Sequence, residues 1–129
     1  MEIAVFSPDK DGSERLTMLI TSNDRSARIS VLPMDEPVLR PLPNRFDAAF
    51  VLADELGALL TLEKIRVRAP KLPIILVSRR PDFALEGIRQ QVSDYLIWPL
   101  DAGDVRKSLK KIENGKRSMV AAYGLNNKQ

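Results

Sequence analysis

The chain has 129 residues and a formal net charge of +3, and its composition, 44% hydrophobic and 29% charged, is typical of a single soluble globular domain. The absence of cysteine and histidine excludes disulfides, zinc fingers, thiol nucleophiles and imidazole bases, which leaves carboxylate chemistry with a hard cation or no chemistry at all. No apolar stretch approaches the roughly 20 residues that cross a bilayer, and the first residues lack the features of a signal peptide, so we expect a cytoplasmic protein.

The first part of the chain contains two strand-like segments around one helix-like segment. Ile3 to Phe6 is a short apolar run that predicts a buried strand, and Ile29 to Leu32 predicts a second one. Between them, residues 13–22 have the periodicity of a helix, for which Ser13 is a suitable N-cap. The four prolines between residues 33 and 43 disfavour a full helix, so we expect a loop or one broken turn there.

The middle of the chain holds its most apolar strands. Residues 48–53 are apolar throughout, as in a central strand that is covered on both faces, and residues 74–77 predict another strand of this kind. Residues 55–68 between them predict a helix with charged residues on its outer face, Glu63, Lys64, Arg66 and Arg68. The apolar residues that we expect on its inner face are Leu56, Leu59, Leu60, Leu62 and Ile65.

The last part of the chain predicts a helix, a strand and a final helix. Pro81 and Asp82 can open a helix over residues 83–91, with Leu85, Ile88 and Val92 facing inward. Residues 95–97 predict a short strand. Asp101 is a suitable N-cap for a helix that ends at Ile112.

Positive charge is concentrated at the end of the chain. Residues 105–129 carry a net charge of +6, which leaves −3 for residues 1–104. The ordinary interpretation is a solvated final helix followed by a tail. The alternative is a patch that binds nucleic acid or a membrane surface, which the lack of interleaved aromatic residues disfavours.

The order of these elements predicts the fold class. Strands that alternate with helices through short connections indicate right-handed crossovers and a doubly wound parallel sheet. We expect an α/β, single-domain, flavodoxin-like (βα)5 fold with strand order 2-1-3-4-5 and a short or missing second helix. In such folds the functional crevice lies at the carboxyl ends of the strands.

The segment from Pro73 to Leu100 resembles the second half of a response-regulator receiver domain of the CheY-like superfamily. An Ile-Ile-Leu-Val-Ser segment ending at Ser78 and an Asp-Tyr-Leu-Ile-Trp-Pro-Leu segment beginning at Asp94 carry the resemblance. It implies a receiver-like domain over residues 1–113 and a basic linker or tail over residues 114–129. In this family a sensor kinase phosphorylates an aspartate after the third strand, beside an acidic pair that holds Mg²⁺. A lysine before a proline and a serine or threonine after the fourth strand contact the phosphoryl oxygens.

The reactive positions of that family are mostly lost in this sequence. Ser7 and Pro8 stand where the acidic pair is expected, and Leu52 stands at the acceptor position when it is counted from Asp47. Trp98 stands where the lysine is expected. The resemblance therefore implies a degenerate receiver, or pseudo-receiver, for which we expect no catalytic residue, metal or cofactor.

Asp54 is the candidate for a displaced acceptor. A shift of two residues along a strand keeps the side chain on the same side, and Asp9 and Asp11 are the remaining acids after the first strand. The alternative is that Asp54 is a capping or loop carboxylate.

Three further residues allow more than one interpretation. Ser78 is either a retained switch hydroxyl or a strand-end hydroxyl that is bonded to the backbone. Tyr95 matches the aromatic residue that couples the site to the fourth-helix face, and it lies either in the core or in an interface. Trp98 either fills the crevice or anchors a partner, and the resemblance implies a cis bond between Trp98 and Pro99.

Three functional hypotheses follow. The first is an atypical, phosphorylation-independent receiver-like domain that acts as a protein–protein interaction or dimerisation module in a bacterial regulatory or localisation system. The second is a phosphorylatable response regulator that uses Asp54 with a non-standard Mg²⁺ site. The third is a flavodoxin-like domain that binds a small anion or nucleotide, which the absence of a glycine-rich phosphate loop disfavours.

The resemblance also implies a contact surface. In related receivers the fourth helix, fifth strand and fifth helix form two-fold homodimers; here they correspond to residues 83–92, 95–98 and 105–112. The candidate interface residues are Phe83, Glu86, Arg89, Tyr95, Trp98 and Lys107. Across such a contact the cations Arg79, Arg80, Arg89 and Lys107 could pair with Asp82, Glu86, Asp94 and Asp104, unless all of them are solvated surface charges.

Besides a second copy of the chain, the partners that we expect are another protein or a covalently linked output domain. Residues 118–124 have the composition of a new strand that begins after a linker. Degenerate receivers of this kind stand at the front of enhancer-binding transcription activators and of MinD-like ATPases in pilus assembly, and residues 92–96 are similar to the latter group. We expect no nucleic acid as a partner of this domain alone.

Overall fold

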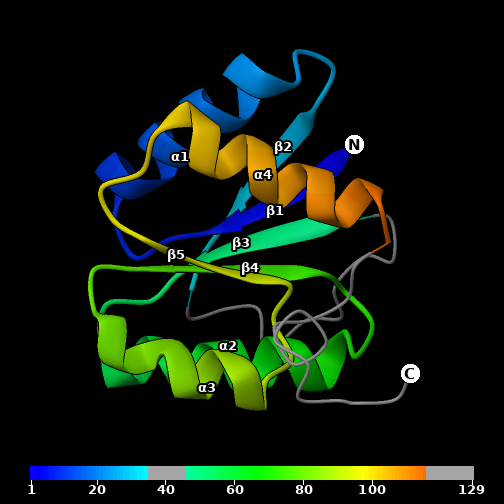
Figure 1. Cartoon of the computed structure of the whole chain (residues 1–129). Helices are drawn as coiled ribbons and strands as arrows, with labels where there is room; N and C mark the ends of the chain where they lie inside the picture. The colour runs from blue at the N-terminus through cyan, green and yellow to red at the C-terminus, as the bar shows by residue number, and fades with distance from the viewer. Residues whose placement is uncertain (35–45, 116–129) are drawn as a thin grey trace.

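The computed structural model describes residues 1–34 and 46–115 of the chain. Its centre is a parallel five-stranded sheet with the order β2-β1-β3-β4-β5 (Figure 1), which confirms the predicted fold class. The strands are β1 (Glu2–Phe6), β2 (Arg28–Leu32), β3 (Ala48–Leu52), β4 (Ile74–Ser78) and β5 (Asp94–Ile97). Each predicted strand is present, with boundaries that differ by one residue at most.

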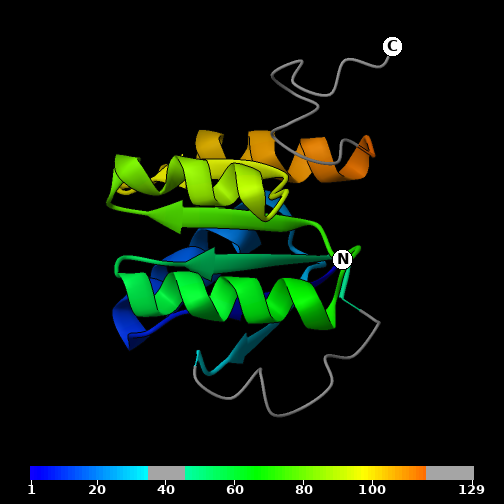
Figure 2. The same cartoon turned by 90° about the horizontal axis from the view of Figure 1, so that it is seen from below.

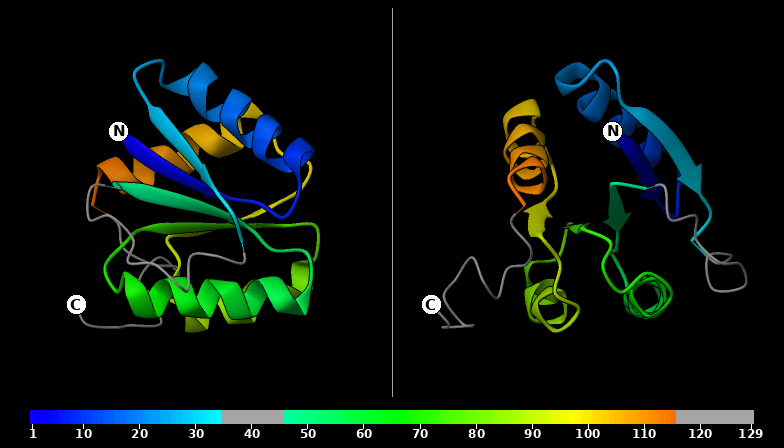
Figure 3. Two further views of the ribbon diagram at one scale, coloured as in Figure 1. Left: turned by 180° about the vertical axis from the view of Figure 1, so that it is seen from behind. Right: turned by 90° about the vertical axis from the view of Figure 1, so that its right-hand side faces the viewer.

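Helices cover both faces of the sheet. On one face lie α1 (Lys10–Asn23) and α4 (Ala102–Glu113); on the other lie α2 (Leu56–Arg68), the 3-10 turn η1 (Pro81–Phe83) and α3 (Ala84–Arg89), as Figures 1 and 3 show. The broken turn that was expected among the four prolines falls largely on residues 35–45, which lie outside the described residues. Within the described residues, no helix is long and apolar enough to cross a membrane.

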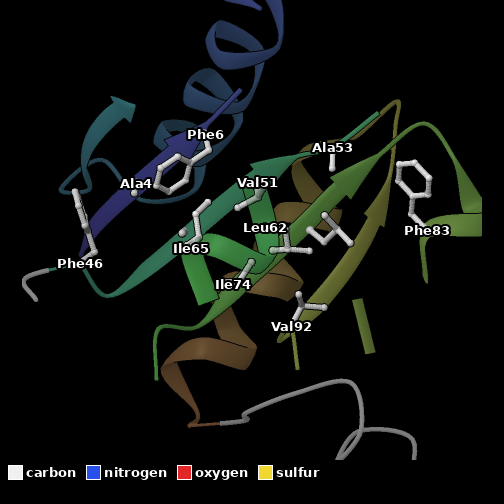
Figure 4. Close-up of a cluster of buried hydrophobic side chains, with 12 residues drawn as sticks. Ala4, Phe6, Phe46, Val51, Ala53, Leu62, Ile65, Ile74, Phe83 and Val92 are labelled. Atoms are coloured by element: carbon white, nitrogen blue, oxygen red, sulfur yellow. The ribbon is translucent and has the colours of Figure 1, made fainter. Parts of the chain in front are cut away.

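The sheet separates two apolar cores. Along β3, Ala49 and Val51 point toward α2 and α3, whereas Phe50 and Leu52 point toward α1 and α4, because successive side chains of a strand alternate between its faces. Figure 4 shows the first of these cores, in which Phe6 and Leu62 lie. Every residue of β3 and β4 is buried, as the uninterrupted apolar runs predicted.

The helix beginnings differ in how well the sequence predicted them. Asp101 caps α4 through a capping box with Asp104, as expected. The prediction that Ser13 caps the first helix was wrong, because α1 begins at Lys10 and the side chain of Asp9 accepts a hydrogen bond from the backbone N–H of Gly12. Ser13 lies inside the helix, and its hydroxyl donates to the carbonyl oxygen of Lys10 at 3.0 Å.

Three leucines that were expected to face inward are exposed. Leu56 and Leu60 of α2 and Leu85 of α3 expose 69%, 58% and 60% of their surface. On α2 the five apolar residues assigned to the inner face span more than half of the helix circumference, whereas a helix that packs on a sheet buries a narrower stripe. Leu62 and Ile65 form that stripe, so Leu56 and Leu60 lie on the opposite side.

Arg66 was expected on the outer face of α2 but is half-buried. Its guanidinium donates to the carbonyl oxygens of Ala69, Pro70 and Leu72, at 3.0, 3.0 and 2.7 Å, and of Gln90 at 3.0 Å. Burial lowers the pKa of Arg66. The side chain thus satisfies carbonyl groups that follow the ends of both α2 and α3, a role for which the fork of five N–H donors is suited.

Candidate functional site

The candidate site lies at the carboxyl edge of the sheet, toward which the arrowheads in Figure 2 point. The segments that follow β1, β3, β4 and β5 meet there because all of these strands are parallel. The residues singled out in the sequence, from Ser7 to Pro99, stand in these four segments.

The segment after β1 is a local turn that caps α1. The Ser7 hydroxyl donates to the carbonyl oxygen of Asp9 at 2.8 Å and accepts the Asp9 N–H at 3.3 Å. The Asp9 carboxylate accepts the N–H of Gly12 at 2.6 Å. Asp9 therefore stabilises the beginning of a helix, and this explains why an acid is found here even though the acidic pair is missing.

The end of β3 is apolar and tightly packed. Leu52 is the last residue of the strand and is completely buried in the core beneath α1 and α4. Gly12 of α1 lies so close that a Cβ atom on it would approach a methyl carbon of Leu52 to 2.5 Å, and the side-chain oxygens of Asp9 and Ser7 to 2.9 Å. The first turn of α1 and the end of β3 therefore leave no room for an added methyl group.

Asp54, two residues further on, is held by Arg79. The backbone N–H of Arg79 donates to one carboxylate oxygen at 2.9 Å, and the Arg79 guanidinium forms an ion pair with the other. The guanidinium carbon of Arg79 also lies 5.1 Å from the centre of the Trp98 ring, within the range of a cation–π contact. Arg79 thus links the segments that follow β3, β4 and β5.

The pairing of Asp54 with Arg79 was missed in the sequence, where Arg79 was considered only as a cation for a second copy. The register of β3 and β4 aligns Leu52 with Val77, so two further residues along each strand bring Asp54 opposite Arg79. A predicted parallel pairing of these two strands contains that signal, since their relative register then fixes which side chains meet.

Ser78 and Tyr95 organise the segment after β4. The buried Ser78 hydroxyl accepts the N–H of Arg80 at 2.9 Å, so it is bonded to the backbone, and the Tyr95 hydroxyl donates to the carbonyl oxygen of Arg80. Tyr95 is half-buried against the core beneath α2 and α3, and burial raises the pKa of its hydroxyl. The Arg80 side chain donates to Asp82, which lowers the pKa of Asp82 and raises that of Arg80.

Trp98 and Pro99 follow β5. Trp98 is half-buried, and one part of its ring packs against the core beneath α1 and α4 while Arg79 covers another. The peptide bond between Trp98 and Pro99 is cis.

The donor set at this edge does not fit Mg²⁺. A magnesium site needs several oxygen ligands in octahedral geometry, but Ser7 and Asp9 are bonded locally, Leu52 is apolar, and Asp54 already accepts two hydrogen bonds from Arg79. Among the residues that the structure describes, no group of three or more acids could hold a metal ion.

The predicted interface residues do not all lie on the surface. Phe83 is 3% exposed and belongs to the core beneath α2 and α3, so it is not available for contact with a partner; its ring faces inward because η1 turns the chain onto the sheet at this point. Arg89 and Lys107 are exposed, and Glu86 forms an ion pair with Arg89 at 3.6 Å.

The four acids that could have paired across a dimer already have partners in the same chain. Asp82 is bound by Arg80, Glu86 by Arg89, and Asp94 by Lys111 at 3.1 Å and the Ser108 hydroxyl at 2.6 Å. Asp104 belongs to the capping box of α4. Intermolecular pairing of these groups would have to replace contacts that the fold already makes.

The comparisons with known proteins agree with this architecture. No protein-family model matches the chain, and no curated protein matches it. A candidate pilus assembly protein (CpaE) from Burkholderia thailandensis is 26% identical and has a TM-score of 0.74, with 88% of this chain and 98% of that chain covered. A candidate pilus assembly-related protein from Burkholderia pseudomallei is 24% identical with a TM-score of 0.75, over 88% and 90% of the two chains.

A response regulator receiver protein from Pseudoalteromonas atlantica is 16% identical with a TM-score of 0.74, over 89% of this chain and 98% of that chain. The sheet order, the crossing helices and these likenesses lead to one assignment. The chain has the fold of a CheY-like response-regulator receiver domain.

Proposed function

We propose that this chain is a phosphorylation-independent receiver-like domain that acts as a protein–protein interaction module in a bacterial regulatory or localisation system. The single observation that carries the proposal is the state of Leu52. The side chain that the resemblance aligns with the phosphate acceptor is a leucine, fully buried in the core and in contact range of Gly12. A hydrocarbon at this place cannot form an acyl phosphate.

The environment of Asp54 supports the same proposal. A phosphoryl acceptor needs a carboxylate oxygen that an incoming phosphorus atom can reach, with a metal ion to offset the charge. Here both carboxylate oxygens of Asp54 accept hydrogen bonds from Arg79. Trp98 stands where a phosphate-binding lysine is expected and packs against Arg79 instead.

The neighbours support a localisation or assembly context. Two of the similar structures are a candidate pilus assembly protein and a candidate pilus assembly-related protein, and a third is a response regulator receiver protein. A domain that keeps the receiver fold while filling its reactive pocket retains surfaces for binding. A role as a binding module, in pilus assembly or a related system, requires only such surfaces.

The test is exposure of the protein to acetyl phosphate or beryllofluoride with Mg²⁺, with a receiver that is known to accept both reagents as the positive control. The readouts are intact mass, sedimentation and the emission of Trp98, the one tryptophan of the chain, whose ring contacts Arg79. We expect no change in any of them.

Two results would contradict the proposal. A mass increase of one phosphoryl group that Asp54→Asn abolishes would identify Asp54 as a working acceptor. A thermal shift with inorganic phosphate or a nucleotide, in the absence of phosphorylation, would favour an anion-binding domain.

A further inference from the structure

The strand β2 forms one edge of the sheet. It pairs with β1 on one side, and within the described residues no other strand pairs with it. Figure 3 shows β2 as the outermost strand on its side of the molecule. The outward backbone N–H and C=O groups of an edge strand have no partner in the sheet, so they can bind one further strand.

The pairing with β1 shows which backbone groups of β2 point outward. The N–H of Arg28 donates to the carbonyl oxygen of Met1 at 2.8 Å, so Arg28 faces β1. Because the backbone groups of successive residues point to opposite sides of a strand, every second residue after Arg28 faces β1 as well. The N–H and C=O groups of Ile29 and Val31 therefore point away from the sheet.

The same two residues carry apolar side chains that the fold covers incompletely. Val31 exposes 53% of its surface, and Ile29 is half-buried at the margin of the core beneath α1 and α4. Both side chains lie on the same face of the sheet because they are two residues apart. A β-branched side chain beside Val31 in an added strand would extend that core past the edge.

We propose that β2 pairs in antiparallel fashion with β2 of a second copy of this chain, about a twofold axis that passes beside Ser30. Ile29 of each copy then lies opposite Val31 of the other. Each of these two pairs exchanges two backbone hydrogen bonds, and the exposed Val31 side chain of one copy packs against Ile29 of the other. The two five-stranded sheets join into one continuous sheet.

The ends of β2 restrict the pairing to this alignment. An axis beside Val31 would place Ile29 opposite Pro33, which has no N–H for the Ile29 carbonyl oxygen. An axis beside Ile29 would place Val31 opposite Ala27, whose N–H already donates within the preceding turn at 3.1 Å. Only the alignment centred on Ser30 satisfies every outward donor and acceptor of the strand.

This fit of β2 to itself identifies a second copy as the occupant of the edge. A twofold contact requires a surface that is complementary to itself, and the alignment matches donors with acceptors and one β-branched side chain with another. It also places Arg28 of each copy opposite Leu32 of the other, so no like charges lie directly opposite each other.

The contact is weak by its size. Five residues from each copy meet, and their four hydrogen bonds are fewer than the roughly ten of a typical stable interface. The expected equilibrium is therefore between monomer and dimer at micromolar to millimolar concentrations. Such an equilibrium suits an assembly in which many copies are held close together, because a high local concentration strengthens a weak contact.

The first experiment is sedimentation velocity and equilibrium on the full chain over a wide concentration range. We expect a concentration-dependent dimer whose association constant falls at least about tenfold in Val31→Lys, because a charged side chain on an edge strand opposes pairing. Val67→Lys is the matched control, since Val67 is an exposed valine on α2, and it should leave the constant unchanged. Circular dichroism verifies that both variants are folded.

Val31→Pro tests the backbone hydrogen bonds themselves. It removes an N–H that points away from the sheet, and proline is tolerated in an edge strand at such a position, so the monomer should remain folded. Because the outward N–H of residue 31 donates in both copies of the proposed dimer, the variant removes two of its four hydrogen bonds. We expect no dimer at any concentration at which the wild type associates.

Cross-linking tests the alignment, because the chain has no cysteine of its own. The two copies of Ser30 would form a pair with Cα atoms about 4.5 Å apart, within the range of a disulfide, so Ser30→Cys should cross-link with oxidised glutathione. Arg28→Cys is the control. Its side chain is 82% exposed, but four positions would separate the two copies, roughly 13 Å at about 3.4 Å per residue, so it should cross-link far more slowly.

Three results would overturn the inference. The first is a protein that is monomeric at every concentration. The second is a dimer that is weakened by Lys107→Glu and not by Val31→Lys, because that result assigns the contact to the α3, β5 and α4 face. The third is equally fast cross-linking of Ser30→Cys and Arg28→Cys.

The inference rests on the proposed function and deepens it, since it names a surface for the interaction module, but the two fail separately. A chain that takes up beryllofluoride and still dimerises through β2 loses the proposed function and keeps the contact. A monomer that is indifferent to beryllofluoride loses the contact and keeps the proposed function.

Discussion

The two halves of the carboxyl edge of the sheet are stabilised by different kinds of contact. Where β1 and β3 end, the packing is steric: Leu52 is fully buried and Gly12 lies against it. Where β4 and β5 end, the packing is polar: Arg79, Ser78 and Tyr95 hold the segment after β4 through hydrogen bonds. Close packing of apolar atoms therefore holds the segments after β1 and β3, which we call the steric half. Hydrogen bonds hold the segments after β4 and β5, which we call the polar half.

This difference shows how a receiver fold can be stable without the acidic residues and metal ion of a reactive pocket. The steric half needs no acidic pair to hold a metal ion, because Leu52 fills the space at the end of β3. Asp9, which follows β1, caps the beginning of α1 instead. Arg79 of the polar half is the counter-ion of Asp54, which follows β3, so this carboxylate has a partner without a metal ion and the ion pair joins the two halves. The two halves are expected to respond differently to mutation.

Leu52→Asp is expected to have the largest effect. It places an unpaired carboxylate in a fully buried apolar site, and the loss of unfolding free energy should exceed about 4 kcal/mol at pH 7. Burial would raise the pKa of the new carboxyl, so stability should fall as the pH rises through that pKa. Urea denaturation at pH 4 and pH 7, with Leu52→Asn as the uncharged control, measures both. A variant as stable as the wild type would show that the site is hydrated.

Gly12→Ala should cost about 1–3 kcal/mol, because the added methyl collides with Leu52 although alanine favours a helix. Gly57→Ala on α2 is the matched control, since no atom lies within 4 Å of its added Cβ. This variant should gain about 0.5–1 kcal/mol. Thermal or urea unfolding measures the change in unfolding free energy for both variants. Equal changes at the two glycines would contradict tight packing between Gly12 and Leu52.

Tyr95→Phe should cost about 1 kcal/mol by removing the hydrogen bond to the carbonyl oxygen of Arg80. The pKa of Tyr95 is raised in the fold by burial, so the protonated hydroxyl contributes stability that is fully present below pH 10 and is lost as the pH rises above it. The difference in unfolding free energy between wild type and variant should therefore shrink as the pH rises above 10. A constant difference over that range would argue against burial of the hydroxyl.

Arg79→Met is expected to have the smallest effect on stability, about 0.5–1 kcal/mol, because the Arg79 side chain is 49% exposed and solvent screens the ion pair. Its clearer signature is optical. Loss of the cation above the ring should shift the emission of Trp98, whereas Arg106→Met, at an exposed position on α4, should leave it unchanged. An unchanged emission spectrum in both variants would contradict the contact between Arg79 and the Trp98 ring.

The strands and most of the helices could be predicted from the sequence because they depend on local patterns. Uninterrupted apolar runs such as residues 48–52 identify strands buried on both faces, and Asp101 with Asp104 identifies the start of α4. These signals lie within a few residues of each other. The strand order then follows from the alternation of strands and helices, which is typical of a doubly wound parallel sheet.

The contacts of the candidate site were harder to predict because they join distant positions. Asp54 and Arg79 are 25 residues apart, and only the relative register of β3 and β4 brings them together. Similarly, the apolar residues of α2 could not be divided between inside and outside by periodicity alone, because Leu56 and Leu60 fit a helix pattern as well as Leu62 does.

Arg66 binds the two ends of α2 and α3 at the opposite edge of the sheet, and this has a consequence for local opening. The carbonyl groups that it holds belong to Ala69, Pro70 and Leu72 in one turn and to Gln90 and Gln91 in another, and the whole of β4 and α3 separates the two turns in the sequence. A single guanidinium cannot release one turn without weakening its hold on the other. In native-state hydrogen exchange, these turns should therefore open as one cooperative unit, so that fraying of either helix loosens the end of its neighbour.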